Sequence, residues 1–551
     1  MMIKSIASKY FNMIERKRLR RVMRGYRHLK NENRLDKIAN LKRDVAAHKL
    51  NMDNLCPSKY IFGAGLANAE IIIRQYLIVH FLDLAFNKKL LCFYEAKNKK
   101  ISHPIPNQWE AIFSNNSVEL NKLACSLLWN IYIFVFLIYG VTSIIKSNLL
   151  VLIGLLKNTD RVPSNYVYFP GLSEGNFCIN ADSNKNYDLM TWYEQWDGRK
   201  YDIDTICHDV EGIPEYKINK TTIKYLSSSL IYTHTSKEYL GYLSWSLCAC
   251  SIAFFDYFRG KWCNPLLLNE ASKAALVRIQ NKKLLAKEYM FGTTGVIYRP
   301  LWTYEAENKG ANINIYFYSV NSGGWKSYKG YPETAPGWSP MSWSRYLVWD
   351  RYQAEFVYRE VGKSANVSVV GPIWFCDSNK QVDKNDAFSI AVFDVQPHRD
   401  SRFQILGSPE DYYIPDITNQ FLSDIYTMAV KRNAIILLKR KRDIGKLLHP
   451  RYKALVSKLT KSNNFKSLDT SISAIKVIEK CDVVISMPFT SPAILARKMG
   501  KPSIFYDPTG TIYKDDKCAH DIEIISGMNE LEKWFDNSAN GSKKALNSYT
   551  T

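Results

Sequence analysis

The sequence predicts an α/β protein in which two parallel, doubly wound sheets follow a helical first third. Apolar residues make up 46% of the 551 residues and charged residues 23%, so the chain can bury several cores. From residue 161 onward, strand patterns alternate with helical patterns, which is typical of βαβ units. The polar stretch 376–386 divides this alternation, so we expect two lobes, 161–380 and 381–551, with a ligand cleft between them.

The first part of the chain, residues 1–160, combines a basic arm with an apolar stretch. Residues 1–50 contain 15 Lys and Arg against 4 Asp and Glu, which supplies half of the formal net charge of +22. Such an arm is typical of proteins that contact an anionic membrane surface or nucleic acid, although a solvated charged helix has the same composition. The sequence has no motif of a nucleic-acid-binding fold, so we expect a membrane surface as the partner and no nucleic acid.

Residues 123–145 form an uncharged run between Lys122 and Lys146 that is long enough to cross a bilayer core of roughly 30 Å. If this run crossed the membrane, the positive-inside rule would keep the basic arm in the cytoplasm and put every residue after 146 on the other side. No feature of those residues suggests a secreted domain. We therefore predict that this run and the shorter run 147–156 form a monotopic or re-entrant helix pair in the inner leaflet. A true span and a soluble core helix are the alternatives.

The compartment follows from the N-terminus and the cysteines. The chain begins without the apolar segment of a secretory signal, and its eleven cysteines include no C-x-x-C pair. We therefore expect reduced thiols and a location at the cytoplasmic face of the inner membrane.

The N-terminal lobe shows strand and helix patterns in turn. Strands are predicted at 165–172, 204–210 and 365–375, and a helical stretch runs through 236–290. Residues 288–319 predict a strand, a loop, the start of a helix and another strand. Residues 345–362 predict a helix.

The C-terminal lobe repeats the βα rhythm more clearly. Strands are predicted at 387–395, 433–440, 481–487 and 501–508, with helical patterns between them. Ligands of open α/β sheets bind outside the carboxyl ends of the strands, so the loops after three of these strands are the candidate site. The candidate binding residues are Asp394, Gln396 and His398 after the first strand, Lys439, Arg440, His449 and Pro450 after the second, and Ser486, Pro488, Phe489, Thr490 and Ser491 after the third.

Two of these loops open helices in a way that suits an anion. Pro492 fits the first turn after Thr490 and Ser491, and the free N–H groups of such a helix start bind phosphate without a metal. A plain Ser/Thr cap is the alternative. His449 precedes Pro450 at another helix start, where an imidazole can donate to a phosphate or protonate a leaving phosphate. The alternative there is a surface histidine.

Motifs of other reaction classes fail on spacing. Gly362-Lys363-Ser364 is similar to the end of a P-loop, but Val357 stands where the earlier glycine is required. Asp202 and Asp204 form a D-x-D pair of the kind that holds a divalent cation, yet this pair is a common chance match. We therefore expect neither a metal site nor a resident cofactor.

Residues 481–510, CDVVISMPFTSPAILARKMGKPSIFYDPTG, resemble the signature of the bacterial polysaccharide-biosynthesis family named for its PFTS motif. Residues 299–310, 313–321 and 345–353 are also similar to that family. The resemblance implies a GT-B-like fold, with two facing Rossmann-like domains behind a membrane-associating region. It covers roughly residues 160–515.

The order of the His-Pro and hydroxyl motifs is similar to that in bacterial sialyltransferases and Kdo transferases. This resemblance implies that His449 and Pro450, together with Ser486, Thr490 and Ser491, hold the CMP part of a CMP-sugar. The gap between the strand at 433–440 and His449 is longer than in that pattern. As a hypothesis for the mechanism, we expect a carboxylate in the N-terminal lobe that deprotonates the acceptor hydroxyl, or that attacks the sugar if configuration is retained. Our first candidate is Glu305, followed by Glu307 and Asp350, while Asp394 is a candidate donor or acceptor contact.

The resemblance thus implies a membrane-associated, metal-independent glycosyltransferase that builds a surface polysaccharide such as O-antigen or capsule. Its expected donor is a CMP-activated acidic ulosonic sugar of the Kdo or sialic acid type, and its acceptor a glycan or a lipid-linked glycan. A UDP- or GDP-sugar transferase, a CDP-polyol phosphotransferase and a non-catalytic assembly scaffold are the alternatives.

Overall fold

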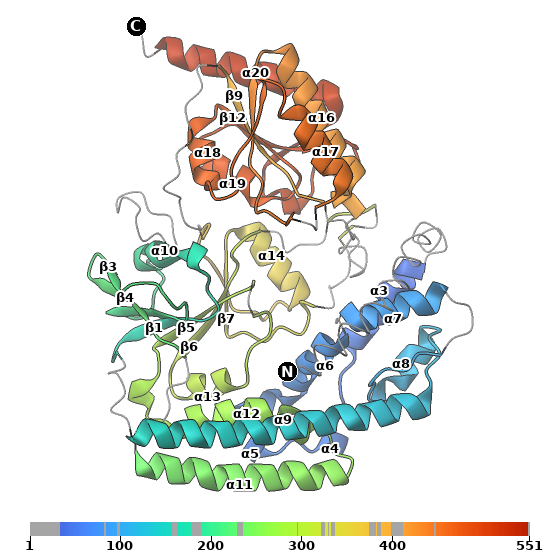
Figure 1. Ribbon diagram of the computed structural model, residues 1–551, viewed down its shortest axis with the longest axis vertical. Helices are drawn as coiled ribbons and strands as arrows, with labels where there is room; N and C mark the ends of the chain where they lie inside the picture. Colours follow the sequence, from blue (N-terminus) through green and yellow to red (C-terminus); the bar gives the residue numbers. More distant parts are fainter. Residues whose placement is uncertain are drawn as a thin grey trace.

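The computed structural model describes residues 34–81, 84–95, 100–156, 163–177, 189–228, 235–294, 296–320, 325–328, 330–331, 337–373, 382, 387–397, 411–445 and 448–548. Figure 1 shows an α/β lobe in the middle of the molecule, with long helices along one end and a second α/β lobe at the other.

The first described part is helical. Its helices are α3 (Arg34–Ala47), α4 (Met52–Leu55), α5 (Lys59–Phe62), α6 (Ala69–Phe81), α7 (Leu84–Glu95), α8 (Glu110–Asn115) and α9 (Lys122–Leu156). The two predicted apolar runs are a single helix, α9, because neither Gly nor Pro interrupts the sequence where they join. Within the described ranges, α9 is the one helix that is long and apolar enough to cross a membrane.

The N-terminal lobe is built on an eight-stranded sheet of order β3-β4-β2-β1-β5-β6-β7-β8. Its strands are β1 (Tyr166–Phe169), β2 (Thr205–His208), β3 (Tyr216–Ile218), β4 (Thr221–Tyr225), β5 (Glu288–Gly292), β6 (Asn312–Tyr316), β7 (Arg345–Val348) and β8 (Val367–Val369). Among these strands, every pairing is parallel except that of β3 with β4. The lobe's helices are α10 (Leu189–Gln195), α11 (Ser236–Phe258), α12 (Cys263–Ile279), α13 (Trp302–Asn308) and α14 (Arg351–Glu360).

Two differences from the predicted elements have local causes. Residues 345–362 contain a strand and a helix, because Asp350 ends β7 and caps α14 by accepting from the backbone N–H groups of Tyr352 and Gln353, both at 3.0 Å. Helices α11 and α12 pack on α9, so the helical layer is completed by residues from beyond the first part of the chain.

The C-terminal lobe contains a fully parallel sheet of order β11-β10-β9-β12-β13-β14. Its strands are β9 (Ser389–Phe393), β10 (Ile435–Leu438), β11 (Phe465–Ser467), β12 (Val483–Ser486), β13 (Ser503–Asp507) and β14 (Glu523–Ser526). Its helices are α16 (Pro415–Lys431), α17 (Pro450–Leu459), α18 (Ala474–Lys480), α19 (Ser491–Lys498) and α20 (Gly527–Ser548). The chain moves from β9 to one side through β10 and then returns to the other side at β12. Ligands of open α/β sheets bind at such a switch point.

The carboxyl ends of the two sheets face each other. Lys441, which follows β10, lies over the ring of Tyr318, which follows β6, with 5.5 Å from its Nζ to the ring centroid. Asp350, at the end of β7, contacts His520 of the C-terminal lobe. Two facing, doubly wound α/β lobes form a GT-B-like arrangement, which confirms the fold class predicted from the sequence.

Candidate functional site

The three loops predicted to meet in the C-terminal lobe do meet. The backbone N–H of His449 donates to the carbonyl of Pro397 at 3.0 Å, which joins the start of α17 to the loop after β9. The N–H of Val395 donates to Sδ of Met487 at 3.3 Å, which joins that loop to the one after β12. The loops therefore form one continuous edge at the switch point.

Four of the predicted binding residues carry a buried polar atom that has no partner among the described residues. These atoms are Oδ1 of Asp394, Nε2 of Gln396, Nε of Arg440 and Oγ of Ser486. They lie at the last residue of β12 or in the loops just after β9 and β10, and these three strands are neighbours in the sheet. A buried polar atom that lacks a hydrogen bond costs free energy, so a cluster of them at a ligand-binding edge indicates a ligand that completes them.

Asp394 is the most perturbed of these groups. Its Oδ2 accepts a short hydrogen bond from the hydroxyl of Tyr452 on α17, while its Oδ1 has no partner within the described structure. Burial raises the pKa of Asp394 to about 6, and the Tyr452 hydroxyl and the nearby Arg440 oppose that rise. Functional sites often contain a carboxylate that is held at such a cost.

We expect Asp394→Asn to stabilise the protein at neutral pH. The carboxyl binds its proton more tightly in the folded protein, with a pKa near 6, than in the unfolded chain, with a pKa of 3.8. The carboxyl therefore contributes most to the free energy of unfolding below pH 3.8. This contribution falls as the pH rises to about 6, and above that pH the free energy of unfolding stays about 3 kcal/mol lower. Urea unfolding of both proteins from pH 4 to 8 should show the variant gaining on the wild type up to pH 6. Parallel curves would contradict the burial cost.

The loop Pro488–Ser491 is held in shape by its neighbours. Phe489 has a φ of 62°, in the left-handed region that residues with a Cβ rarely adopt. The hydroxyl of Thr490 donates to the carbonyl of Met487 at 2.8 Å, and Tyr413 donates to the carbonyl of Pro488 at 2.8 Å. These contacts fix the backbone just before α19.

Thr490 occupies the cap position of α19, yet its side chain does not cap the helix. Its hydroxyl is turned back to Met487, so it leaves the first backbone N–H groups of α19 to another acceptor. The plain Ser/Thr cap, the alternative left open by the sequence, is therefore not what the structure contains. Ser491 is half-buried at the first helical position, beside this positive helix end.

His449 caps α17, with Pro450 at the first helical position. Its Nδ1 accepts from the backbone N–H of Arg451 at 3.3 Å. In the neutral ring, this hydrogen bond places the proton on Nε2.

Two residues predicted from the second loop behave differently. Arg440 lies near Asp394 and Tyr452 and influences both of their pKa values. Lys439 is buried, and its ammonium donates to the carbonyls of Arg440 and Thr470 at 2.6 and 3.1 Å, so it stabilises the loop and not a phosphate. His398 lies outside the described residues.

Trp325, from the N-terminal lobe, is a residue of this region that the sequence did not single out. Its indole packs edge-on against the rings of Phe489, Tyr412 and Tyr413, with centroid distances of 5.0, 5.1 and 5.4 Å. One aromatic side chain of the N-terminal lobe thus rests on the loop that leads to α19. No local pattern marks Trp325, because all three partner rings are distant in sequence.

Glu305 is not placed for catalysis. Only 3% of its surface is exposed, and Oε1 accepts from Nε of Arg278 and the backbone N–H of Ala64, at 2.9 and 2.8 Å. These contacts tie α13 to α12 and to the turn after α5, and Figure 1 shows that region beside the long helices. The catalytic role expected for Glu305 is therefore wrong, because its carboxylate is committed to a buried ion pair.

The two other catalytic candidates are also committed. Glu307 accepts from the buried guanidinium of Arg299 at 2.6 Å, on the same helix as Glu305. Asp350 caps α14 with one oxygen, and its other oxygen lies 2.7 Å from Nδ1 of His520. The His520 hydrogen bond and charge hold the pKa of Asp350 below its usual value despite desolvation by burial. We correct both assignments to structural roles.

Residues 245–535 match the family of polysaccharide biosynthesis PFTS motif proteins, and Pro488–Ser491 are the motif itself. The chain belongs to that family. No curated protein matches this PFTS protein. Similar solved structures include the trehalose-6-phosphate synthase OtsA, with a TM-score of 0.36, 9% identity, and coverage of 68% of this chain and 91% of that one.

Two further structures are similar to the PFTS protein at the same level. The UDP-GlcNAc 2-epimerase from Methanocaldococcus jannaschii has a TM-score of 0.34 and 10% identity, covering 68% of this chain and 92% of that one. The wall teichoic acid polymerase TagF has a TM-score of 0.32 and 12% identity, covering 68% and 78%.

The opposing edge of the PFTS protein offers another carboxylate. In its N-terminal sheet, β1 is followed by β2 on one side and later by β5 on the other, which makes the loop after β1 a switch point. Asp209 shapes this loop by accepting from the N–H of Gly171 at 2.8 Å, and Ser173 and Asn176 close the following turn with a capping box. Glu174 projects from that turn and is exposed.

A further set of contacts joins the lobes of the PFTS protein, between α14 with its neighbours and residues 515–521. The contacts pair Lys326 with Asp515 and Asp516, Tyr331 with Asp516, Asp350 with His520, Arg351 and Tyr352 with Asp521, and Glu355 with Lys517. A small cavity lies within this contact, lined by residues of both lobes, among them Tyr352, Glu355, Lys517 and His520.

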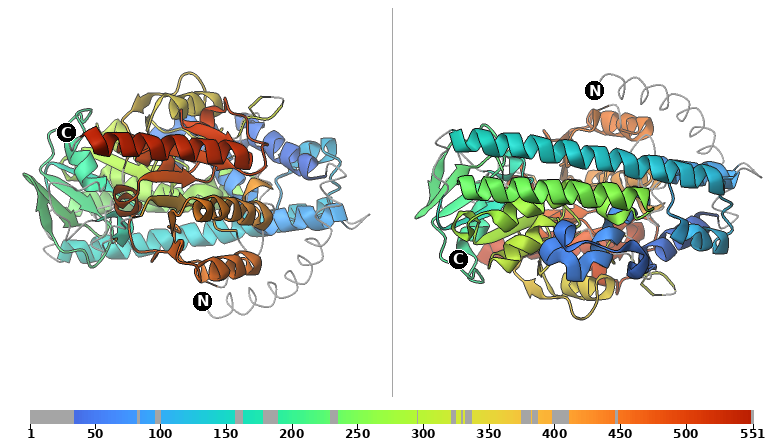
Figure 2. Two further views of the ribbon diagram at one scale, coloured as in Figure 1. Left: turned by 90° about the horizontal axis from the view of Figure 1, so that it is seen from above. Right: turned by 90° about the horizontal axis from the view of Figure 1, so that it is seen from below.

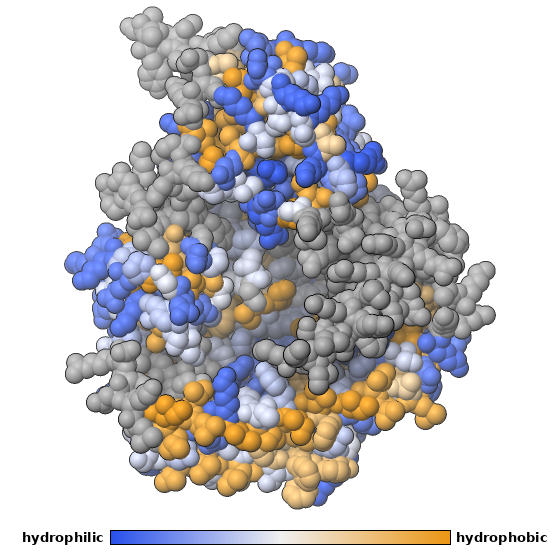
Figure 3. Space-filling view, viewed as in Figure 1, coloured by the Kyte–Doolittle hydropathy of each residue, from blue (hydrophilic) through white to orange (hydrophobic). Residues whose placement is uncertain are grey.

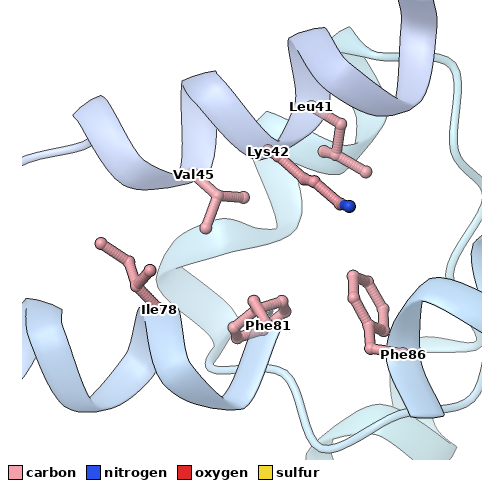
Figure 4. Close-up of a pocket in the computed structure, with 6 residues that line it drawn as sticks. All are labelled: Leu41, Lys42, Val45, Ile78, Phe81 and Phe86. Atoms are coloured by element: carbon pink, nitrogen blue, oxygen red, sulfur yellow. The ribbon is translucent and has the colours of Figure 1, made fainter. Parts of the chain in front are cut away.

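A smaller cavity lies in the helical part. Figure 4 shows Lys42 and five apolar side chains converging from α3, α6 and α7 around a small space. Burial lowers the pKa of Lys42 to about 8. The cavity belongs to the packing of the helices, away from both strand edges. Among the described residues, no three His, Cys, Asp or Glu side chains cluster as metal ligands would.

Proposed function

We propose that this PFTS protein is a glycosyltransferase of the GT-B type that needs no metal. The observation that carries the proposal is the set of partnerless buried atoms of Asp394, Gln396, Arg440 and Ser486 beside the uncapped start of α19. A nucleotide-sugar donor would complete them, because its phosphate can accept from Gln396, Arg440 and Ser486, while a sugar hydroxyl can donate to Oδ1 of Asp394. N–H groups at a helix start and nearby cations stabilise a phosphate without a metal.

In this proposal, the C-terminal lobe stabilises the leaving nucleotide. The bond between the anomeric carbon and the phosphate oxygen breaks, and the charge that develops on the phosphate is met by the α19 N–H groups, Arg440 and the imidazole of His449. The anomeric carbon then faces the N-terminal lobe. An acceptor hydroxyl forms the new bond and gives its proton to a carboxylate, for which the position of Glu174 at the opposing edge is suited.

The donor that we propose is a CMP-activated acidic ulosonic sugar, and the acceptor a glycan or a lipid-linked glycan of a surface polysaccharide such as O-antigen or capsule. The donor rests on the similarity of the His449-Pro450 and Ser486–Ser491 motifs to those of CMP-sugar transferases. A UDP- or GDP-sugar donor, and a CDP-polyol phosphotransferase, use the same phosphate contacts. We place the enzyme at the cytoplasmic face of the inner membrane.

A thermal-shift panel tests the proposal. The purified full chain is heated with CMP, CDP, UDP or GDP, without added metal, and His449→Ala is measured beside it. A ligand at 100 times its dissociation constant adds about 2.7 kcal/mol to the native state, which is readily detected. A shift with CMP that His449→Ala weakens supports the CMP-sugar reading. A preference for UDP or GDP keeps the transferase and replaces the donor, and no shift with any nucleotide favours the assembly scaffold.

A further inference from the structure

Helices α9 and α11 lie side by side and antiparallel, as Figure 2 shows from below. The amide of Asn148 donates to the hydroxyl of Ser246 at 3.1 Å, and the rings of Phe134 and Tyr257 meet at 5.6 Å. The two helices therefore form one flat, two-helix surface at the end of the molecule. With 35 residues, α9 is about 50 Å long.

The inner side of α9 is packed against the rest of the protein along its whole length. Its buried residues recur along one side of the helix and are Cys125, Trp129, Ile133, Leu137, Ile144 and Val151. A Cβ at Gly140 would lie 2.6 Å from Cβ of Leu268, so the absence of a side chain lets α9 press onto α12. Helix α12 contains buried polar residues, among them Asn264 and Ser272. An upright α9 would carry these into the bilayer core, so α9 cannot span while it is folded in this way.

The outer sides of both helices expose apolar residues in a continuous band, which Figure 3 shows in orange along this end. The exposed fraction reaches 86% for Leu123 and 69% for Phe258. The exposed apolar residues are Leu123, Leu127, Ile131, Phe134, Val135, Ile138, Tyr139, Ile145, Leu149, Leu152 and Ile153 on α9, and Leu240, Leu247, Phe254, Phe255 and Phe258 on α11. Soluble proteins rarely expose an apolar surface of this extent without a partner.

The charges around this band are mainly cationic. The exposed charged residues on the two helices or next to their ends are Lys122, Lys146, Lys237 and Arg259, together with Glu119 just before α9. Lys122 forms an ion pair with Glu110 at 3.0 Å, so among the described residues the other three cations make up the unpaired positive border. The two acidic residues within the helices are occupied, since Glu238 forms the capping box of α11 with Thr235 and Asp256 accepts from Asn264 at 2.6 Å. Apolar residues with a cationic border complement the surface of an anionic bilayer.

We propose that the face of α9 and α11 lies in the plane of an anionic lipid bilayer, with the apolar band among the upper acyl chains. A second copy of the chain is the competing partner, but it would bring one cationic border against another. The inference deepens the membrane location given under the proposed function. It rests on the apolar face and not on transfer, so either can fail while the other stands.

Vesicle flotation tests this inference on the full chain without detergent. We expect binding to mixed phosphatidylcholine–phosphatidylglycerol vesicles that weakens with salt and with the removal of phosphatidylglycerol. Phe254→Asp combined with Phe258→Asp should lower binding by about tenfold or more, because two carboxylates would enter the interface. The matched control is Val369→Asp on β8, which changes an apolar residue that is 58% exposed elsewhere and should bind as the wild type does.

Two results would overturn the inference. Full binding by the double variant, with an unfolding temperature like that of the wild type, would show that the band does not contact lipid. A wild-type dimer that ignores vesicles, and that the same double variant converts to a monomer, would assign the band to a second copy. Nucleotide thermal shifts measured on the same samples report on the donor site separately, so a failure of one proposal is distinguishable from a failure of the other.

Discussion

We expect Ser491→Asp to abolish nucleotide binding while the fold keeps or gains stability. The new carboxylate would stand at the first position of α19, where a negative charge is favourable to the helix by about 0.3–1 kcal/mol. The same charge would oppose a donor phosphate. Two like charges about 4 Å apart near a protein surface repel by about 4 kcal/mol, which weakens binding by roughly a hundredfold or more. Calorimetric titration with CMP, beside thermal unfolding, measures both effects.

The control for this variant is Ser491→Asn, which has nearly the same shape as Asp but no charge. It should keep most of the affinity, because the donor contacts at a helix start are backbone N–H groups. Equal affinity for nucleotide in the Asp and Asn variants would place the phosphate somewhere other than α19. A loss in both variants would show that the size of residue 491, and not its charge, limits binding.

Glu174→Gln is expected to lower the transfer rate by a factor of about 100 to 10,000, the range that a positioned general base contributes. Glutamine keeps the shape of the side chain but cannot take the acceptor proton. The turn itself should persist, because the capping box of Ser173 and Asn176 and the contact of Asp209 with Gly171 do not use Glu174. Steady-state kinetics should show the loss in kcat, and nucleotide thermal shifts should be unchanged.

Glu305→Gln is the matched control on the same lobe. It breaks the ion pair with Arg278 and should lower the unfolding temperature, while transfer measured well below that temperature continues. The opposite pattern, an inactive Glu305→Gln together with an active Glu174→Gln, would assign the general base to Glu305 on α13.

The meeting of the three loops at the candidate donor edge could be predicted from the sequence because its information is local. Each loop follows a short buried strand, and the residues that matter, such as Asp394, Ser486 and His449, stand within a few positions of a strand end or a helix start. Because the strands are parallel, their carboxyl ends lie at one edge of the sheet, so the loops that follow neighbouring strands come together there. The sequence pattern also predicted the βα alternation, but not the short strands β11 and β14.

The surroundings of the candidate carboxylates could not be predicted in the same way. Glu305 has the right local pattern, a carboxylate near a helix start, but its partners Arg278 and Ala64 are 27 and 241 residues away. Only the packing of α13 on α12 shows that it faces the interior. Lys439 was misassigned for a similar reason, since Thr470 lies on a different loop. The sequence predicted only part of the apolar face. It marked the apolar run that forms α9, whereas α11 contributes to this surface only because it packs beside α9.

The apolar face and the facing strand edges lie at opposite ends of the N-terminal lobe (Figure 1). Between them stand a helix layer, roughly 10 Å thick, and the sheet, whose five-residue strand β5 spans about 17 Å. A lobe that rests on lipid through α9 and α11 therefore holds its reaction centre well above the headgroups. If the acceptor is a lipid-linked glycan, as proposed, a lipid that carries a single sugar would stay below this height, whereas a growing chain of several sugars would reach it. Helices α9 and α11 would then fix the distance between the bilayer and the site, and this distance would select acceptors by length.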